Sequence, residues 1–174
     1  MAFPTSISAP LLISMAPNQS ELLVQSLASN ATLGRFWLVP VLGGAPHRFG
    51  NVIGNDGAFS ADGKHIVYVI GSEIYKANLD GTESRKLLSV SGVALFPRFA
   101  PDGSVVRFTL LDVNTTSASI WEVRSDGTGL HPILPDWNKP HNEFCGSWTP
   151  DGRYYIFEAV RAHHSDFRNS VNAS

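Results

Sequence analysis

A ten-residue motif recurs along this chain and leaves few folds open to it. Three copies align without gaps at residues 59–68, 99–108 and 148–157, and each has an aromatic first residue and Asp-Gly at its fourth and fifth positions. Residues 15–24 form a degenerate fourth copy, in which Asn18 and Gln19 replace the Asp-Gly pair. Such internal similarity indicates a fold built by repeating one supersecondary unit.

Apolar residues alternate in the second half of each copy. The position four residues after the Asp or Asn holds Leu22, Ile66, Val106 and Tyr155, and the position two further on holds Val24, Tyr68, Phe108 and Phe157. Because successive side chains of a strand point to opposite faces, apolar residues two apart predict a β-strand with one buried face. The preceding Asp-Gly predicts a tight turn, since Gly accepts positive φ and Asp bonds its own backbone.

A second motif follows each of the first three copies. An apolar and an aromatic residue open the segments 36–44, 74–82 and 120–128, which contain a Gly-Gly or Asp-Gly turn, and a short strand around Phe49, Leu87 or Ile133 closes each unit. The units start 44, 40 and 49 residues apart, at Met15, Phe59, Phe99 and Trp148. A propeller blade takes about 40–45 residues, and a Pro- and Asn-containing insertion at 135–143 explains the longest interval. The spacing predicts an all-β chain of four-stranded antiparallel propeller blades.

These residues resemble the WD-like propeller repeat of TolB-type proteins, which reads Phe/Trp-Ser-Pro-Asp-Gly-Lys, an apolar strand, then Ile-Tyr and Asp-Gly. Segments 99–103 with 120–127 match this pattern best, and segments 59–63 with 74–81 match it nearly as well. The resemblance covers about residues 13–159 and implies a β-propeller of the kind found in larger bacterial proteins. It implies little about function, because one fold carries many functions.

The repeat count departs from that family. About three and a half repeats predict an incomplete ring, whereas propellers close with about 4–8 blades. We divide the chain into an N-terminal extension at 1–12, propeller repeats at 13–160 and a C-terminal tail at 161–174. Uncovered blade faces favour association, so the chain is expected to be either a truncated product or one of two copies that complete a ring.

Composition excludes several classes of protein. The 174 residues are 43% hydrophobic and 16% charged, which rules out disorder of the whole chain. The net charge of -2 offers no basic field for phosphates, so we expect no nucleic-acid partner. Cys145 is the only cysteine, so neither an internal disulfide nor a multi-cysteine zinc site can form. No apolar run predicts a membrane span. The compartment stays open, because the lack of a basic signal sequence favours the cytoplasm and the resemblance favours the periplasm.

No residue pattern indicates catalysis or a cofactor, and we expect no catalytic, cofactor-binding or metal-binding residue. The chain has no Gly-x-Ser-x-Gly elbow and no glycine-rich phosphate loop before a helix. His141, Glu143 and Cys145 would share one face of a strand, but they lack the Cys-x-x-Cys partner of zinc deaminases. This pattern favours a polar loop between blades, and the His163–Asp166 stretch favours an inert surface tail.

Two recurring residue types are expected to be structural. Asp62, Asp102 and Asp151 are predicted to cap turns, because each local loop supplies only one acid to a calcium ion that needs six to eight oxygens. The recurring aromatic residues are predicted to pack in the core rather than to stack on sugars: Trp37, Tyr75, Trp121 and Trp148.

Three arginines of one repeat are the candidate partner contact: Arg98, Arg107 and Arg124. Arg107 stands in a column that is apolar in the other copies, and it is expected either to face the rim or to pair with Glu122 on the next strand. The sequence thus predicts a non-enzymatic interaction or sensing module that binds a protein or a second copy of itself. The alternatives are an accessory or remnant propeller of a larger peptidase, kinase or winged-helix regulator and, further off, a glycan- or metal-binding module.

Overall fold

The structure is a computed structural model, and it describes residues 7–28, 31–137 and 139–160. Its strands form four antiparallel sheets in chain order. The first sheet holds β1 (Pro10–Met15), β2 (Glu21–Ser26), β3 (Gly34–Pro40) and β4 (His47–Gly54), and the second holds β5 (Asp56–Phe59), β6 (His65–Ile70), β7 (Glu73–Asn78) and β8 (Arg85–Ser89). The third holds β9 (Val93–Phe99), β10 (Val105–Leu111), β11 (Ala118–Arg124) and β12 (His131–Pro132), and the fourth holds β13 (Glu143–Trp148) and β14 (Tyr155–Ala159).

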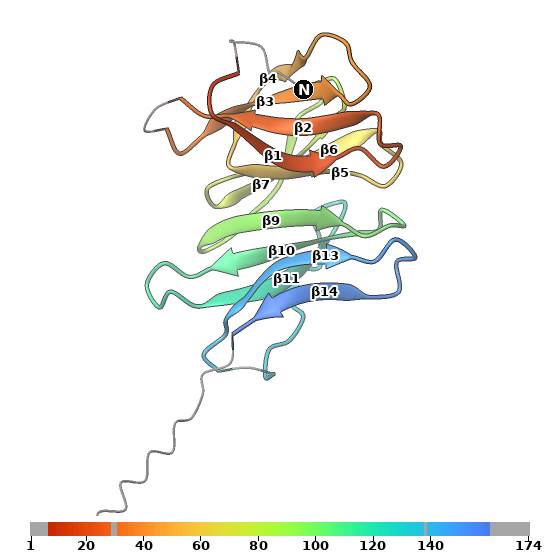
Figure 1. The fold of residues 1–174 in the computed structure, drawn as a ribbon. Helices are drawn as coiled ribbons and strands as arrows, with labels where there is room; N and C mark the ends of the chain where they lie inside the picture. Colours follow the sequence, from red (N-terminus) through yellow and green to blue (C-terminus); the bar gives the residue numbers. More distant parts are fainter. Residues whose placement is uncertain (1–6, 29–30, 138, 161–174) are drawn as a thin grey trace, which may run out of the picture.

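The sheets follow one another as propeller blades in an open arc (Figure 1). Within each sheet every strand pairs with its neighbours in sequence, and the first strands β1, β5, β9 and β13 lie next to one another from sheet to sheet. The prediction of about three and a half four-stranded blades in an incomplete ring is therefore confirmed. Each motif copy begins at the last residue of a first strand, as at Phe59 and Phe99, and its Asp-Gly turn leads into the second strand.

The prediction of one buried face is wrong for the second sheet, because this sheet has a neighbour on both sides. Ile66 and Tyr68 of β6 pack in one apolar cluster with residues of the first sheet. Val67 and Val69 point the other way and pack in a second cluster with residues of the third sheet. The alternating columns of the motif therefore face the preceding and the following sheet in turn.

The alternation between the preceding and the following sheet also shows which way the side chains of the Arg107 column point. Its other members are Leu23, in the cluster between the first and second sheets, and Val67, in the cluster between the second and third. Ile156 holds the same position on β14 and is 65% exposed, because no described sheet follows the fourth. Arg107 thus faces the fourth sheet.

The opposite end of the arc is partly covered by the chain itself. Ile7 is buried against Val24, Trp37 and Val39 on the outer face of the first sheet. Two backbone contacts of Ser8 hold this segment, with Ser26 Oγ 3.0 Å from its amide and the Leu27 amide 3.1 Å from its carbonyl. β1 begins at Pro10, so the expected boundary after residue 12 falls within a strand. The tail at 161–174, with the His163–Asp166 stretch, lies outside the described residues.

Candidate functional site

A row of charged side chains crosses the third sheet on the face toward the fourth. Strand register places Arg98 opposite Arg107, and Arg107 opposite Glu122. Side chains of directly paired residues share a face, so two of the three candidate arginines lie side by side. Arg124 pairs with Val105 further along β11, where it is exposed.

Arg107 is held between the two sheets by three contacts. Its Nε lies 2.7 Å from Glu122 Oε2, which confirms the predicted pairing, and both side chains are about four-fifths buried. On its other side the guanidinium carbon lies 4.1 Å from the ring centroid of Trp148 and 4.9 Å from that of Tyr155. A planar guanidinium suits such stacking. Arg107 therefore replaces an apolar residue inside the contact between sheets and does not lie at the rim.

We call the contact between the third and fourth sheets the third interface, and its polar character extends beyond Arg107. Six buried side-chain atoms in the described part of the chain lack a hydrogen bond, and Trp37 Nε1 is the only one from the first sheet. The others belong to the third and fourth sheets or the loop between them: Thr109 Oγ1, His141 Nδ1, Glu143 Oε2, Trp148 Nε1 and Tyr155 Oη. Two of these atoms, His141 Nδ1 and Glu143 Oε2, form an ion pair. Because buried polar groups without hydrogen bonds cost free energy, we expect this contact to stabilise the chain less than its two apolar counterparts.

Glu143 and Tyr155 are two of these groups. Glu143 is fully buried, and its Oε2 lies 3.5 Å from His141 Nδ1. Burial raises the pKa of Tyr155 to about 12, although the charges of Arg98 and Arg107 act to lower it. Sequence reasoning missed Glu143 as a buried acid. The signal was in the alignment, because the equivalent residue five positions before Phe99 is the apolar Ala94.

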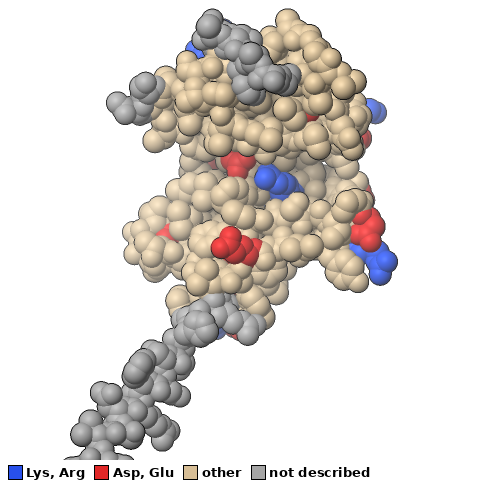
Figure 2. All heavy atoms as spheres, in the orientation of Figure 1, with Lys and Arg blue, Asp and Glu red and all other residues tan. Residues whose placement is uncertain are grey.

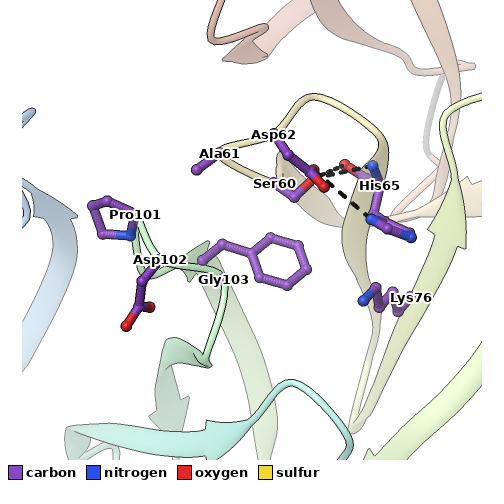
Figure 3. A pocket seen from close by; sticks show the side chains of 9 residues that line it. Ser60, Ala61, Asp62, His65, Lys76, Pro101, Asp102 and Gly103 are labelled. Carbon is purple, nitrogen blue, oxygen red and sulfur yellow. Dashed lines mark hydrogen bonds and ion pairs between the residues drawn. The ribbon is translucent and has the colours of Figure 1, made fainter.

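Grooves open at equivalent places between successive sheets. One of about 420 Å³ lies at the third interface and is lined by Arg107, Glu122, Trp148, Asp102 and Asp151 among others. The other, of about 230 Å³, lies between the second and third sheets (Figure 3) and is lined by Ser60, Ala61, Asp62, His65, Lys76, Phe99 and the turn 101–103.

The turns that border the two grooves differ in one residue. A Cβ on Gly152 would lie 3.2 Å from the Pro101 ring, and one on Gly63 would lie 3.9 Å from the Pro17 ring. The second sheet has Ala61 where the others have proline, and a Cβ on Gly103 would meet nothing within 4 Å. A groove lies beside the turn that lacks proline, and a larger one lies at the third interface, where Pro101 is present, so proline alone does not decide whether a groove opens.

Ser60, Asp62 and His65 in this groove form a turn and not a catalytic triad. Ser60 Oγ donates to Asp62 at 2.5 Å and accepts from the His65 amide at 3.0 Å, while His65 Nδ1 is 3.8 Å from the carboxylate. The fourth sheet repeats this arrangement with Thr149 Oγ1, which donates to Asp151 at 2.5 Å. The side chains of Ser60 and His65 are not hydrogen-bonded to each other, so His65 does not activate Ser60 as a nucleophile.

The turn-capping role predicted for the recurring aspartates is confirmed. Asp62, Asp102 and Asp151 each accept the amide of the residue two positions on, at 3.0, 2.9 and 3.1 Å. Side-chain hydroxyls of Ser60, Ser104 and Thr149 also donate to them, and these bonds are the largest cause that lowers the pKa of each carboxyl.

The polar loop predicted for His141, Glu143 and Cys145 is found only at His141, since Glu143 and Cys145 lie in a strand. β13 begins only at Glu143, and a bulge between Phe144 and Ser147 gives Cys145 a φ of 52°. Glu143 is therefore buried at the third interface while Cys145 is exposed. Within the described ranges no group of three or more His, Cys, Asp or Glu side chains is placed to hold a metal ion.

The recurring aromatics pack as predicted only in part. Trp37 is buried beneath Ile7, and Tyr75 stacks on Tyr68 with ring centroids 5.2 Å apart. Trp121 packs against the cluster between the second and third sheets. Trp148 instead packs on Arg107, because the column that faces it is charged in the third sheet.

Comparisons with known proteins identify the fold. No family model matches the sequence, and no curated protein matches it. TolB from Acinetobacter baumannii is similar in structure, with a TM-score of 0.71, 16% identity, and coverage of 90% of this chain and 39% of TolB. A putative TolB from Agrobacterium tumefaciens has a TM-score of 0.61 and 19% identity, with coverage of 91% of this chain and 72% of that protein. A nidogen/laminin complex has a TM-score of 0.68 and 14% identity, with coverage of 87% of this chain and 57% of the matched chain. The chain spans about two-fifths of the Acinetobacter TolB chain, and it has a TolB-like β-propeller fold.

Proposed function

We propose that this chain is a non-enzymatic propeller module that binds protein at its fourth sheet. The observation that carries the proposal is that no described strand or sheet covers the outer side of that sheet. Among the described strands β14 pairs only with β13, and Ile156 and Tyr154 are 65% and 59% exposed. A hollow of about 570 Å³ borders this side and is lined by Cys145, Ser147 and Ile156 among others. An apolar face beside an unpaired strand edge is a template for another chain.

Charge supports a protein partner over a polyanion. Lys, Arg, Asp and Glu are scattered over the face shown in Figure 2, without a broad patch of one sign. One structural neighbour is itself a protein complex, of nidogen with laminin. No helix in the described part of the chain is long and apolar enough to cross a membrane. Arg124, which is exposed at the end of β11, is the arginine that we propose for an added partner contact.

A crosslinking experiment with a matched control tests this function. A photoreactive amino acid is placed at Ile156, and in a second variant at Ile53, which is 40% exposed on β4. We expect one crosslinked product of discrete mass from position 156, with a second copy or another protein, and none from position 53. Light scattering on the purified chain then shows whether the partner is a second copy. A chain that stays monomeric and yields no product at 156 in its native extract would overturn the proposal.

A further inference from the structure

We infer that Asn18 and Asn114 are acceptors for N-linked glycans. Both begin the pattern Asn-x-Ser/Thr, in which the middle residue is not proline and which marks an N-glycosylation acceptor. Asn30 and Asn172 also begin it but lie outside the described residues. The inference concerns a modification of this chain, and it is independent of the proposed protein-binding function.

The pattern occurs more often than composition explains. The chain has 10 asparagines, and 4 of them precede a Ser or Thr by two residues. Ser and Thr together supply 27 of the 174 residues, so about one or two of the 10 asparagines would have such a neighbour by chance. Because a three-residue pattern is short, the place of each asparagine in the fold must support the assignment as well.

The two described acceptors lie on connections between strands. Asn18 is in the turn between β1 and β2, and Asn114 is in the loop between β10 and β11, at the opposite end of the strands (Figure 1). Both residues are exposed. A bulky glycan needs an attachment point of this kind on a surface loop. Neither connection belongs to the fourth sheet, so the glycans would be attached outside the sheet that we propose for protein binding.

The side-chain nitrogen of an acceptor has to be free to react. Asn55, which is outside the pattern, has this nitrogen engaged, because its Nδ2 donates to the Thr32 carbonyl at 2.9 Å. In Asn18 the bonds are made by Oδ1 instead, which accepts from the Ser20 amide at 3.0 Å and from the Ser20 hydroxyl at 2.7 Å. Asn18 Nδ2 has no hydrogen-bond partner among the described residues and remains available.

The turn at Asn18 has the same bonds as the Asp-Gly turns. In the third sheet the Ser104 amide and hydroxyl donate to Asp102 Oδ1 at 2.9 and 2.7 Å, and Ser20 makes the same two bonds to Asn18. Asn in place of Asp therefore keeps the turn and supplies an amide nitrogen where the other copies have a carboxylate oxygen. The hydroxyl that the pattern requires is already in place as part of the turn.

Asn114 lies in a loop that is exposed over the whole pattern. Asn114, Thr115 and Thr116 are all exposed. The Asn114 amide donates to Asp112 Oδ1 at 2.8 Å, and its side chain also interacts with this surface carboxylate. The Thr116 hydroxyl donates to the Thr115 carbonyl at 2.7 Å. The acceptor is therefore held at the surface, outside both strands.

Glycan transfer uses the exposed amide directly. Nδ2 attacks C1 of a sugar carried on a lipid pyrophosphate, which is the donor that the transferase uses. The N–C1 bond forms as the C1–O bond to the pyrophosphate breaks, the lipid pyrophosphate leaves, and Nδ2 gives one proton to a base of the transferase. Because N-glycosylation marks secreted proteins, the assignment also requires that this chain is exported across a membrane.

Mass spectrometry of the native chain tests the assignment. The chain is isolated from its native extract, digested, and treated with peptide N-glycosidase in heavy-oxygen water, which converts a glycosylated Asn to a labelled Asp. We expect label at Asn18 and Asn114 and none at Asn55. A sample without the glycosidase measures spontaneous deamidation. Absence of label at Asn18 or Asn114, or equal label without the enzyme, would overturn the inference.

Single substitutions within the pattern give matched controls. The full chain, carrying an export signal, is produced in a eukaryotic cell that glycosylates secreted proteins. Thr116→Ala is expected to abolish the glycan at Asn114 and Thr115→Ala to keep it, because only the third residue of the pattern is fixed. Ser20→Ala should abolish the glycan at Asn18, whereas Ser20→Thr should keep it. A modification that persists in Thr116→Ala or Ser20→Ala would show a different chemistry and would overturn the inference.

Discussion

Arg107 shows how one side chain changes the contact between two repeats. Apolar residues fill its column at the two preceding contacts, whereas Arg107 bonds Glu122 and stacks on Trp148 and Tyr155. A buried ion pair compensates its own desolvation only when both partners are present. The stability of the third interface therefore depends on the Arg107–Glu122 pair, whereas that of the other two contacts depends on the apolar surface they bury.

Removal of one partner is expected to cost more than removal of both. Arg107→Leu leaves Glu122 buried without its partner and should reduce the free energy of unfolding by about 2 kcal/mol. The double variant Arg107→Leu/Glu122→Leu copies the Leu23–Leu38 pair of the first sheet and should recover most of this loss. Urea unfolding of the two single variants and the double variant gives the coupling directly. A double variant that equals the sum of the single losses would show that the pair does not act as a unit.

At the scale of the element, the Asp-Gly turns join neighbouring sheets as well as neighbouring strands. Each turn closes with an amide-to-carbonyl bond across four residues, such as Gly63 N to Ser60 O at 2.9 Å and Gly103 N to Ala100 O at 2.8 Å. Proline holds the second position in three of the four turns and alanine in one. This position favours proline in such turns, so Ala61 is the exception among the four copies of the motif.

Ala61→Pro is expected to stabilise the chain by about 0.4–1 kcal/mol. The substitution restricts the unfolded chain, and the ring would lie toward Gly103, as Pro101 lies toward Gly152. Pro101→Ala is the matched control and should lose a similar amount. Chemical unfolding of both variants provides the test. A loss of stability from Ala61→Pro would mean that the second turn differs in backbone conformation from the other three.

At the scale of the whole molecule, the contacts between sheets change from apolar to polar along the arc. The spacing of the repeats and the alternation of apolar residues predicted the blades, because both patterns follow from the geometry of β-strands and recur in each unit. The third interface could not be predicted in the same way. Its partnerless groups, such as Thr109 Oγ1 and Tyr155 Oη, result from packing between sheets, and the bulge that separates Glu143 from Cys145 breaks strand alternation.

The repeated turns predict a loss of stability in acid. Hydrogen bonds hold the pKa values of Asp62, Asp102 and Asp151 below the ordinary 3.8. Their contribution is complete above pH 3.8 and is lost as the pH falls through the lower folded values. Burial raises the pKa of Asp56. Protonation of Asp56 as the pH falls toward 3.8 therefore increases the stability of the folded chain, which opposes the loss from the turns.

Thermal unfolding from pH 6 to pH 2 checks this balance with Asp102→Asn as the probe. The variant should melt at a lower temperature than the original chain at pH 6. The difference should disappear toward pH 2, because the original chain loses the negative charge of Asp102 on protonation and the variant has no such charge at position 102. A difference that stays constant across this range would show that the Asp102 charge does not stabilise the turn.

The gradient along the arc predicts unequal local stability. Ile66, Val67 and Val69 of β6 are fully buried between two apolar contacts. β13 and β14 contact the third sheet through the third interface, and no described sheet covers their other side. Amides of β6 are expected to exchange only through global unfolding, and those between β13 and β14 through local opening. The difference should be about 2 kcal/mol, or roughly a thirtyfold change in protection. The Arg107→Leu variant should widen this difference, because it weakens the third interface alone, and equal protection in all four sheets would contradict the gradient.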